Sequence, residues 1–366
     1  MAGSTIGNIF KITTWGESHG KGIGVVIDGC PAGLPLCEED IQKYLDRRRP
    51  GQSSFSTQRQ ESDSVRILSG TFEGKTTGTP ISLMIANEDQ RSRDYGDIAT
   101  YYRPGHADYT YDAKYGFRDY RGGGRSSGRE TIGRVAAGAI AAKILAHFGI
   151  TFLTYSKAIG PVTIDTTRFD AEEIYCNPLY MPDAAAAAEA ADYLNRCKAE
   201  TNSAGGIVEC IISGVPAGIG DPVFDKLDAN LAKAIFSIGA VKGFEIGDGF
   251  AVAQATGLTN NDAFFTDSEG KIEKATNHAG GILGGISDGS AIILRAAFKP
   301  TPSIASTQRT VNKSGENIDI NIKGRHDPII VPRAVVVVES MAAITLLDAM
   351  LQNTTATMES LEKIYG

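Results

Sequence analysis

Short runs of apolar residues, separated by turns rich in glycine and proline, divide the chain into strand-like segments. Runs of about four to eight residues that are rich in valine, isoleucine and aromatic side chains are typical of strands. The strands expected on this basis are 10–15, 23–27, 64–69, 80–86, 206–213, 291–298 and 331–338. Neighbouring strands occur in pairs more often than they alternate with helices, which favours an α+β protein over a doubly wound α/β sheet.

Longer segments with a helical spacing of apolar residues lie between these strands. The helices expected are 37–48, 127–148, 182–198, 223–235 and 339–352. The second of them starts at a capping-box pattern, Ser127 to Glu130, and its alanine-rich, apolar surface predicts a deeply buried helix. The chain contains no repeat of fixed period and no low-complexity linker, so we expect one domain that spans residues 1–366.

Composition and charge exclude several classes of protein. Of the 366 residues, 42% are apolar, which is ample for a large core, and the net charge of −7 argues against general nucleic-acid binding. The five cysteines form no CxxC pair, which favours reduced thiols over a disulfide framework or a zinc site. We find no signal peptide and no apolar run as long as a membrane span, so we expect a cytoplasmic protein without a metal.

The segment from Arg103 to Thr131 carries the most chemical information. It holds His106 in a Pro-Gly turn, the triple glycine 122–124, and the arginines Arg103, Arg118, Arg121, Arg125 and Arg129. Arginine suits bidentate recognition of phosphate or carboxylate, and consecutive glycines let backbone N–H groups approach an anion. The triple glycine matches neither a dinucleotide-binding nor a Walker loop, and a flexible RGG segment is the alternative. We interpret the segment as an anion-binding site with a proton-transfer group.

Three further segments carry candidate chemistry. His19 lies in a glycine-flanked turn, where a functional histidine and an ordinary surface histidine are both reasonable. The segment 299–303 offers a cation and hydroxyls between prolines, either for phosphate or as a rigid exit from a strand. The segment 324–328 places Arg325, His326 and Asp327 on one turn, where groups of opposite charge shift each other's pKa. These patterns indicate an enzyme acting on a small, multiply anionic substrate, and they specify no cofactor.

Taken together, the motifs resemble the chorismate synthase family. The matching segments are GESHG at 16–20, DRRRPGQ at 46–52, RPGHADYTY at 103–111, RGGGRSSGRET at 121–131, GVPAGIGDPVFDKLDA at 214–229, VKGFEIGDGF at 241–250, NHAGGILGGISDG at 277–289, KPTPSI at 299–304 and GRHDP at 324–328. They follow the family order over nearly the whole chain, and they are specific to this one family.

The resemblance implies a function and an architecture. The implied reaction is the anti-1,4 elimination of phosphate from 5-enolpyruvylshikimate 3-phosphate to chorismate, catalysed by a carbon–oxygen lyase of the shikimate pathway. It implies a need for reduced FMN without net redox change, with NADPH acting indirectly through a separate flavin reductase. It also implies a single-domain β-α-β sandwich, in which two antiparallel sheets flank a helical core, and a homotetramer. We expect no nucleic-acid or membrane partner.

The same resemblance assigns roles to residues. His106 corresponds to the histidine that protonates the reduced flavin, His19 to the one that assists the departing phosphate, and Asp327 to the carboxylate near flavin N5. The substrate- or NADP-binding positions are Arg48, Arg103 and Arg129. The FMN-binding positions are Arg125, Ser126, Ser127, Gly239, Ala240, Gly284, Lys299, Pro300, Thr301, Pro302, Ser303 and Arg325. Ser54 stands where many relatives carry an arginine, which weakens the expectation of direct NADPH contact.

Two other functions are distinguishable from this one. An FMN-dependent NAD(P)H oxidoreductase using the same pocket would oxidise NADPH in proportion to product. A non-catalytic RGG-type RNA-binding protein would bind RNA with a strong dependence on salt, and the acidic charge of the chain weighs against it.

Overall fold

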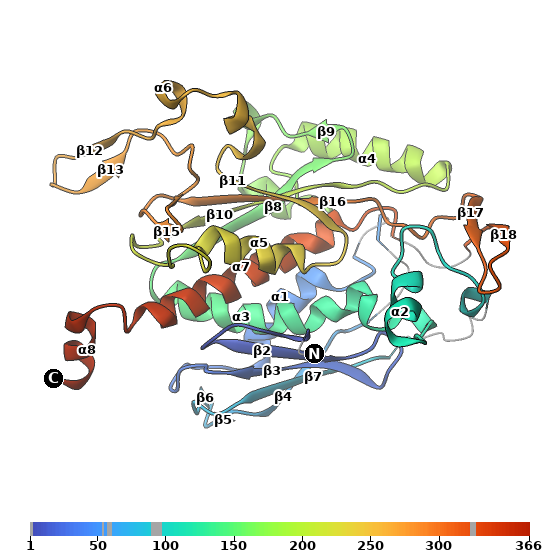
Figure 1. Cartoon of the computed structure of the whole chain (residues 1–366), viewed down its shortest axis with the longest axis horizontal. Coiled ribbons are helices and arrows are strands. Elements are labelled where there is room, and N and C mark those ends of the chain that lie inside the picture. The colour runs from blue at the N-terminus through green and yellow to red at the C-terminus, as the bar shows by residue number, and fades with distance from the viewer. Residues whose placement is uncertain (1–2, 53–54, 57–60, 89–96, 323–326) are drawn as a thin grey trace.

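Two five-stranded sheets lie on either side of a layer of helices (Figure 1). The structure is a computed structural model that describes residues 3–52, 55–56, 61–88, 97–322 and 327–366. All neighbouring strands within both large sheets run antiparallel. This mixture of helices with antiparallel strands agrees with the α+β class that the sequence predicts.

The first sheet has the order β1-β2-β3-β7-β4. Its strands are β1 (Thr5–Ile6), β2 (Lys11–Gly16), β3 (Gly22–Asp28), β7 (Ile81–Ala86) and β4 (Val65–Ser69). Burial alternates along β7, where Ile81, Leu83 and Ile85 are fully buried, as expected for a strand with one face on the core. The side chain of Trp15 on β2 crosses over Gly24 of β3, where an added Cβ would lie 2.3 Å from the indole ring.

The second sheet has the order β11-β16-β10-β8-β9. Its strands are β11 (Val241–Ile246), β16 (Ile292–Phe298), β10 (Gly206–Ser213), β8 (Thr151–Ile159) and β9 (Val162–Thr163). Every second residue of β16 is buried, starting at Ile292. Helix α4 (Ala184–Ala199) contacts β9 on the outer side of this sheet, and the carboxylate of Asp183 caps its first turn.

Four helices fill the space between the sheets. They are α1 (Glu38–Arg48), α3 (Thr131–His147), α5 (Leu227–Phe236) and α7 (Val331–Asn353). Helix α3 packs on the first sheet, α7 packs on the second, and the two helices pack against each other. The deep burial predicted for α3 is confirmed. Gly138 permits the close approach of the two helices, because an added Cβ would lie 2.2 Å from the Cβ of Ser340.

The strand predicted for 331–338 is wrong, because these residues form the first turns of α7. The four valines Val335–Val338 are each no more than 3% exposed. A short apolar run does not distinguish a buried strand from a helix buried on all sides, and packing decides between them.

Helix α7 is also long and apolar enough to cross a membrane, contrary to the expectation from the sequence that no apolar run reaches that length. However, 78% of its most apolar window is buried inside the molecule, as in a core helix.

The remaining elements are short. They are β5 (Thr71–Phe72), β6 (Lys75–Thr76), β12 (Phe264–Thr266), β13 (Ile272–Lys274), β14 (Ile282–Leu283), β15 (Ile286–Ser287), β17 (Gln308–Val311), β18 (Asn317–Ile320), α2 (Asp108–Tyr115), α6 (Gly257–Asn260) and α8 (Met358–Tyr365).

The helix predicted for 127–148 begins with a separate 3₁₀ turn, η4 (Gly128–Glu130). The hydroxyl of Ser127 accepts a hydrogen bond from the N–H of Arg129, whereas the Glu130 carboxylate binds Thr14 and Arg134. The predicted capping box is therefore only half formed.

Candidate active site

The triple glycine adopts a backbone conformation that other residues rarely take. It lies in the 3₁₀ segment η3 (Arg121–Ser126), directly before the start of α3. The φ angles of Gly122, Gly123 and Gly124 are 59°, 81° and 53°, all in the left-handed region that favours glycine. Gly123 and Gly124 are buried. The segment is thus an ordered turn, which argues against the alternative of a flexible RGG segment.

The two candidate histidines lie against successive glycines of this turn. An added Cβ on Gly122 would lie 2.2 Å from both Cε1 and Nδ1 of His19. An added Cβ on Gly123 would lie 3.1 Å from Cε1 and 3.3 Å from Nε2 of His106. His19 is 7% exposed, so it is not an ordinary surface histidine. The fold therefore brings together two loop histidines that are far apart in the sequence.

His106 lies beside a buried ion pair. Its Nδ1 is 3.0 Å from Nη2 of Arg103 and 3.1 Å from Oδ1 of Asp108. Arg103 also contacts Asp108 directly, with Nε 2.7 Å from Oδ2. Burial lowers the pKa of His106, and the charge of Arg103 lowers it further, while Asp108 raises it. Burial alone would raise the pKa of Asp108, but hydrogen bonds from Arg103 and His106 hold it well below its usual range.

Two of the predicted arginines form a second, fully buried group. Arg48 and Arg129 share the carboxylate of Asp63, at 2.9 Å and 3.0 Å respectively. Burial is the main reason why the pKa of Arg48 is lowered, to about 9. The Nε of Arg48 has no hydrogen-bond partner among the described residues. A buried guanidinium with a free donor is suited to an anionic ligand.

Asn87 joins the arginine group to the His19 turn. Its side-chain oxygen accepts a hydrogen bond from Nε of Arg129 at 2.9 Å. Its amide nitrogen donates to the carbonyls of Glu17 and Gly20, on either side of His19. Both groups therefore belong to one site near the start of α3. No motif in the sequence singled out Asn87 or Asp63, and they are recognised only from their contacts.

Asp327 is connected to the arginine group through Arg333, in the first turn of α7. The ion pair between Arg333 Nη1 and Asp327 Oδ2 is 2.9 Å long, and Nε of Arg333 donates to the carbonyl of Arg48 at 3.1 Å. A cavity of about 250 Å³ lies beside Arg333 and Arg47. The predicted residues Arg325, His326 and Ser54 lie outside the described residues.

Most of the positions expected to bind FMN gather around the His106 turn. Nζ of Lys299 donates to the carbonyl of Gly105, and the backbone N–H of Lys299 donates to the carbonyl of Ala240 at 3.0 Å. An added Cβ on Gly105 would lie 3.2 Å from Cβ of Pro302. The segments 239–240 and 299–303 are thus neighbours of His106. Ser303 is buried, and Thr301 has a buried hydroxyl without a partner among the described residues.

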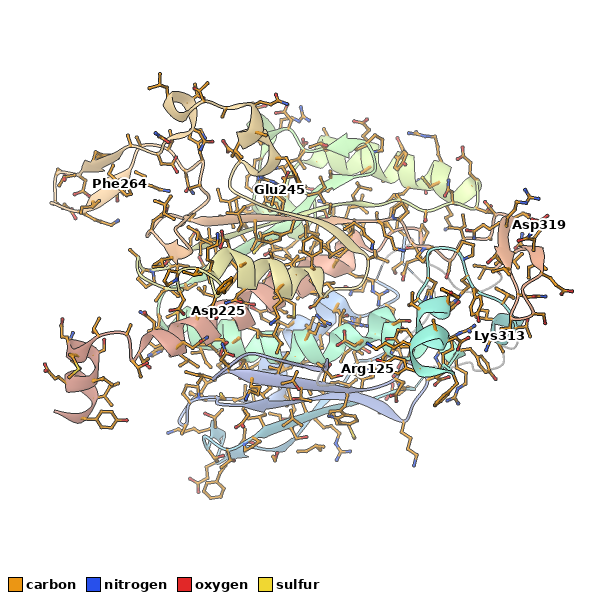
Figure 2. The ribbon with its side chains drawn as sticks, in the orientation of Figure 1. Arg125, Asp225, Glu245, Phe264, Lys313 and Asp319 are labelled. Atoms are coloured by element: carbon orange, nitrogen blue, oxygen red, sulfur yellow. The ribbon has the colours of Figure 1, made fainter. Side chains whose placement is uncertain are left out.

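Of the other predicted FMN positions that the structure describes, Ser126 lies next to the glycine that faces His106, whereas Arg125 and Gly284 have other neighbours. Figure 2 shows Arg125 near the first sheet, where its guanidinium donates to Thr14 Oγ1 at 2.8 Å. Ser126 donates to the carbonyl of Gly123 at 2.7 Å. Gly284 lies in the turn between β14 and β15, at the opposite end of the molecule from α2 (Figure 1). Gly284 is therefore not part of the same group within one chain.

Comparison with known proteins gives one consistent result. A sequence model of chorismate synthase matches residues 10–351. Chorismate synthase of Agathobacter rectalis is 69% identical over 365 residues, covering 100% of this chain and 99% of the relative. Chorismate synthase of Chloroflexus aurantiacus is 54% identical, covering 96% of each chain. A crystal structure of chorismate synthase superposes with a TM-score of 0.77 and 33% identity, over 98% of this chain and 96% of that one. The chain belongs to the chorismate synthase family.

Proposed function

We propose that the chain catalyses the anti-1,4 elimination of phosphate from 5-enolpyruvylshikimate 3-phosphate, with chorismate as the product. The observation that carries this proposal is the placement of His19 and His106 on successive glycines of one turn. Arg129 connects that turn to a second buried guanidinium, Arg48. Two protonatable groups beside buried cations are what the expulsion of a phosphate group requires. The family of the chain supports the same activity.

We propose reduced FMN as the cofactor, with NADPH acting only through a separate flavin reductase. The free buried hydroxyl of Thr301 and the cation of Lys299 next to the His106 turn fit such an anionic ligand. An added Cβ on Gly239 would meet nothing within 4 Å, so the backbone there is open to a flat ligand. Residues 125–127, 239–240 and 299–303 would hold the cofactor, together with Arg325. Reduced FMN bound there would supply electron density reversibly, which would keep the reaction redox neutral.

The residues of the chain then take four roles. His106 holds a proton on the flavin side of the site, and His19 donates a proton to the departing phosphate. Asp327, held by Arg333, supports the removal of the proton at C6 of the substrate. The buried arginines stabilise the charge that develops on the phosphate, an electrostatic contribution that is largest where water is excluded.

We further propose a cytoplasmic, single-domain β-α-β sandwich that assembles as a homotetramer and has no nucleic-acid or membrane partner. The hairpin of β12 and β13 projects from the molecule and exposes apolar side chains, of which Phe264 is 58% exposed (Figure 2). Gly284 could reach an FMN site only in a neighbouring subunit, because of its place in the fold. Sedimentation analysis of the purified protein tests this proposal, and a monomer at micromolar concentration would contradict it.

The reaction is tested by comparing two histidine variants. His106→Ala should lower turnover at least ~10²-fold, the low end of the effect of losing a general acid. His147→Ala is the control, because His147 is exposed at the far end of α3. Equal turnover of both variants would exclude His106 as the acid. Stoichiometric oxidation of NADPH with product would favour the oxidoreductase alternative instead.

A further inference from the structure

The Nδ1 atom of His106 faces two groups with opposite hydrogen-bonding character. Nη2 of Arg103, 3.0 Å away, can only donate. Oδ1 of Asp108, 3.1 Å away, can only accept while the carboxyl is ionised. A bare Nδ1 would accept from Arg103, whereas a protonated Nδ1 would donate to Asp108. The stronger of these two contacts decides which nitrogen of the neutral ring carries the proton.

The contacts of Arg103 favour Asp108 as the partner of the ring. Arg103 already donates to Asp108 from Nε at 2.7 Å, from Nη2 at 2.8 Å and from its backbone N–H at 3.0 Å. The guanidinium therefore already has the carboxylate as its acceptor, and only the second hydrogen of Nη2 competes with Asp108 for Nδ1 of His106. Asp108 is 2% exposed, and each carboxylate oxygen can accept two hydrogen bonds, so Oδ1 has room for an N–H of the ring.

The opposite edge of the ring points into the candidate active site. Cε1 and Nε2 of His106 face Gly123, whose neighbour Gly122 lies against His19. We propose that Asp108 is a positioning residue that keeps a proton on Nδ1 of His106, so that Nε2 is the nitrogen that exchanges protons with ligands. When His106 acts as an acid, the Nε2–H bond breaks, its electron pair stays on the ring, and the proton passes to the ligand. The hydrogen bond from Nδ1 to Asp108 persists in both states.

The other charged groups around the ring show what the loss of Asp108 would do. Arg103 and Lys299 act on His106 as cations, and Arg118 approaches the same oxygen of Asp108 at 3.7 Å. In Asp108→Asn the charged groups that remain beside the ring, among the described residues, are the cations Arg103, Lys299 and Arg118. Donation by Arg103 then favours a bare Nδ1 and a proton on Nε2. A neutral ring in that tautomer cannot accept a proton from the ligand side at Nε2.

The tautomer is measured directly by ¹⁵N NMR of the ligand-free, full-length protein labelled at histidine. His106→Ala identifies the His106 signals. Asp112→Asn is the matched control, because Asp112 lies one turn later on α2 and pairs with Arg118 at 2.5 Å and Lys313 at 3.1 Å. Above the pKa of His106, we expect the Nδ1–H tautomer in the wild type and in Asp112→Asn, and the Nε2–H tautomer in Asp108→Asn. An Nε2–H tautomer in the wild type would overturn the inference, even if Asp108→Asn fails to fold.

A second readout connects the tautomer to turnover and rests on the proposed function. Asp108→Asn should lower turnover ~10²- to 10⁴-fold, the upper figure being the effect of a tautomer change in a serine protease triad. The pH profile should lose the limb assigned to His106, while FMN binding is retained. Asp112→Asn should stay within a few-fold of the wild type. A changed tautomer with normal turnover would support the inference about Asp108 and contradict the role of His106 as an acid.

Discussion

Replacement of Gly122 by alanine tests whether the triple glycine positions His19. Two effects follow from the structure. The φ angle of 59° costs an alanine roughly 1–2 kcal/mol. In addition, the new methyl group would lie 2.2 Å from two ring atoms of His19. Since ordinary carbon contacts are ~3.5–4.0 Å, the ring must move by about 1 Å or more.

Gly116→Ala separates the backbone cost of a positive φ from the approach of the new methyl group to His19. Gly116 ends α2 with a φ of 79°, and an added Cβ there would meet nothing within 4 Å. Gly116→Ala should therefore lose about 1–2 kcal/mol in the free energy of unfolding, measured with urea, and Gly122→Ala should lose at least as much, because its methyl group also displaces His19. Only Gly122→Ala should also lose turnover, by ~10²-fold, because a displacement of ~1 Å at a reacting group can cost that much. Equal turnover of the two variants would refute the proposed link between Gly122 and His19.

Three further predictions concern stability and pH. Asp63→Asn removes the buried carboxylate that Arg48 and Arg129 share and should lower the free energy of unfolding by ~3–5 kcal/mol in urea. Glu359→Gln, in an exposed pair, should change it by less than ~1 kcal/mol. Gly138→Ala should destabilise by ~1–3 kcal/mol, because its methyl group meets Ser340; an unchanged urea midpoint would contradict this packing. NMR titration should give His106 a pKa below 6.5 without ligand. Its unfolded state then binds more protons, so stability falls as pH drops from 6.5 toward the folded pKa, a dependence that His106→Gln should remove.

Local sequence patterns were sufficient for most elements of the fold. The strand predicted for 80–86 is observed as Ile81–Ala86, and the helix predicted for 37–48 as Glu38–Arg48. The strand is recognisable from the alternation of its apolar residues, and the helix from its acidic first turn and basic last turn. The valine run in α7 has neither, because it is buried on all sides, and β-branched residues alone wrongly indicated a strand. Its helical state follows from packing between α3 and the second sheet, which no local pattern encodes.

The site was predictable where its residues are neighbours in the chain. The turn that carries His106 and the triple glycine was singled out because arginines and glycines are concentrated there. Asp63 was missed because its role depends on two arginines that reach it from other elements. Asp108 stands two residues after His106, where an aspartate supports a functional interpretation of the histidine and is equally an ordinary turn-forming residue. Its contact with Nδ1 of His106 depends on side-chain geometry, which a sequence pattern does not contain.

The proposed elimination can be followed by anaerobic incubation of the purified protein with 5-enolpyruvylshikimate 3-phosphate and photoreduced FMN, without NADPH. Phosphate and chorismate are followed together with the oxidation state of the flavin. We expect equimolar phosphate and chorismate with no net oxidation of the flavin. Oxidation of the flavin in step with substrate loss, without chorismate, would contradict it and would require new roles for His19, His106 and Asp327.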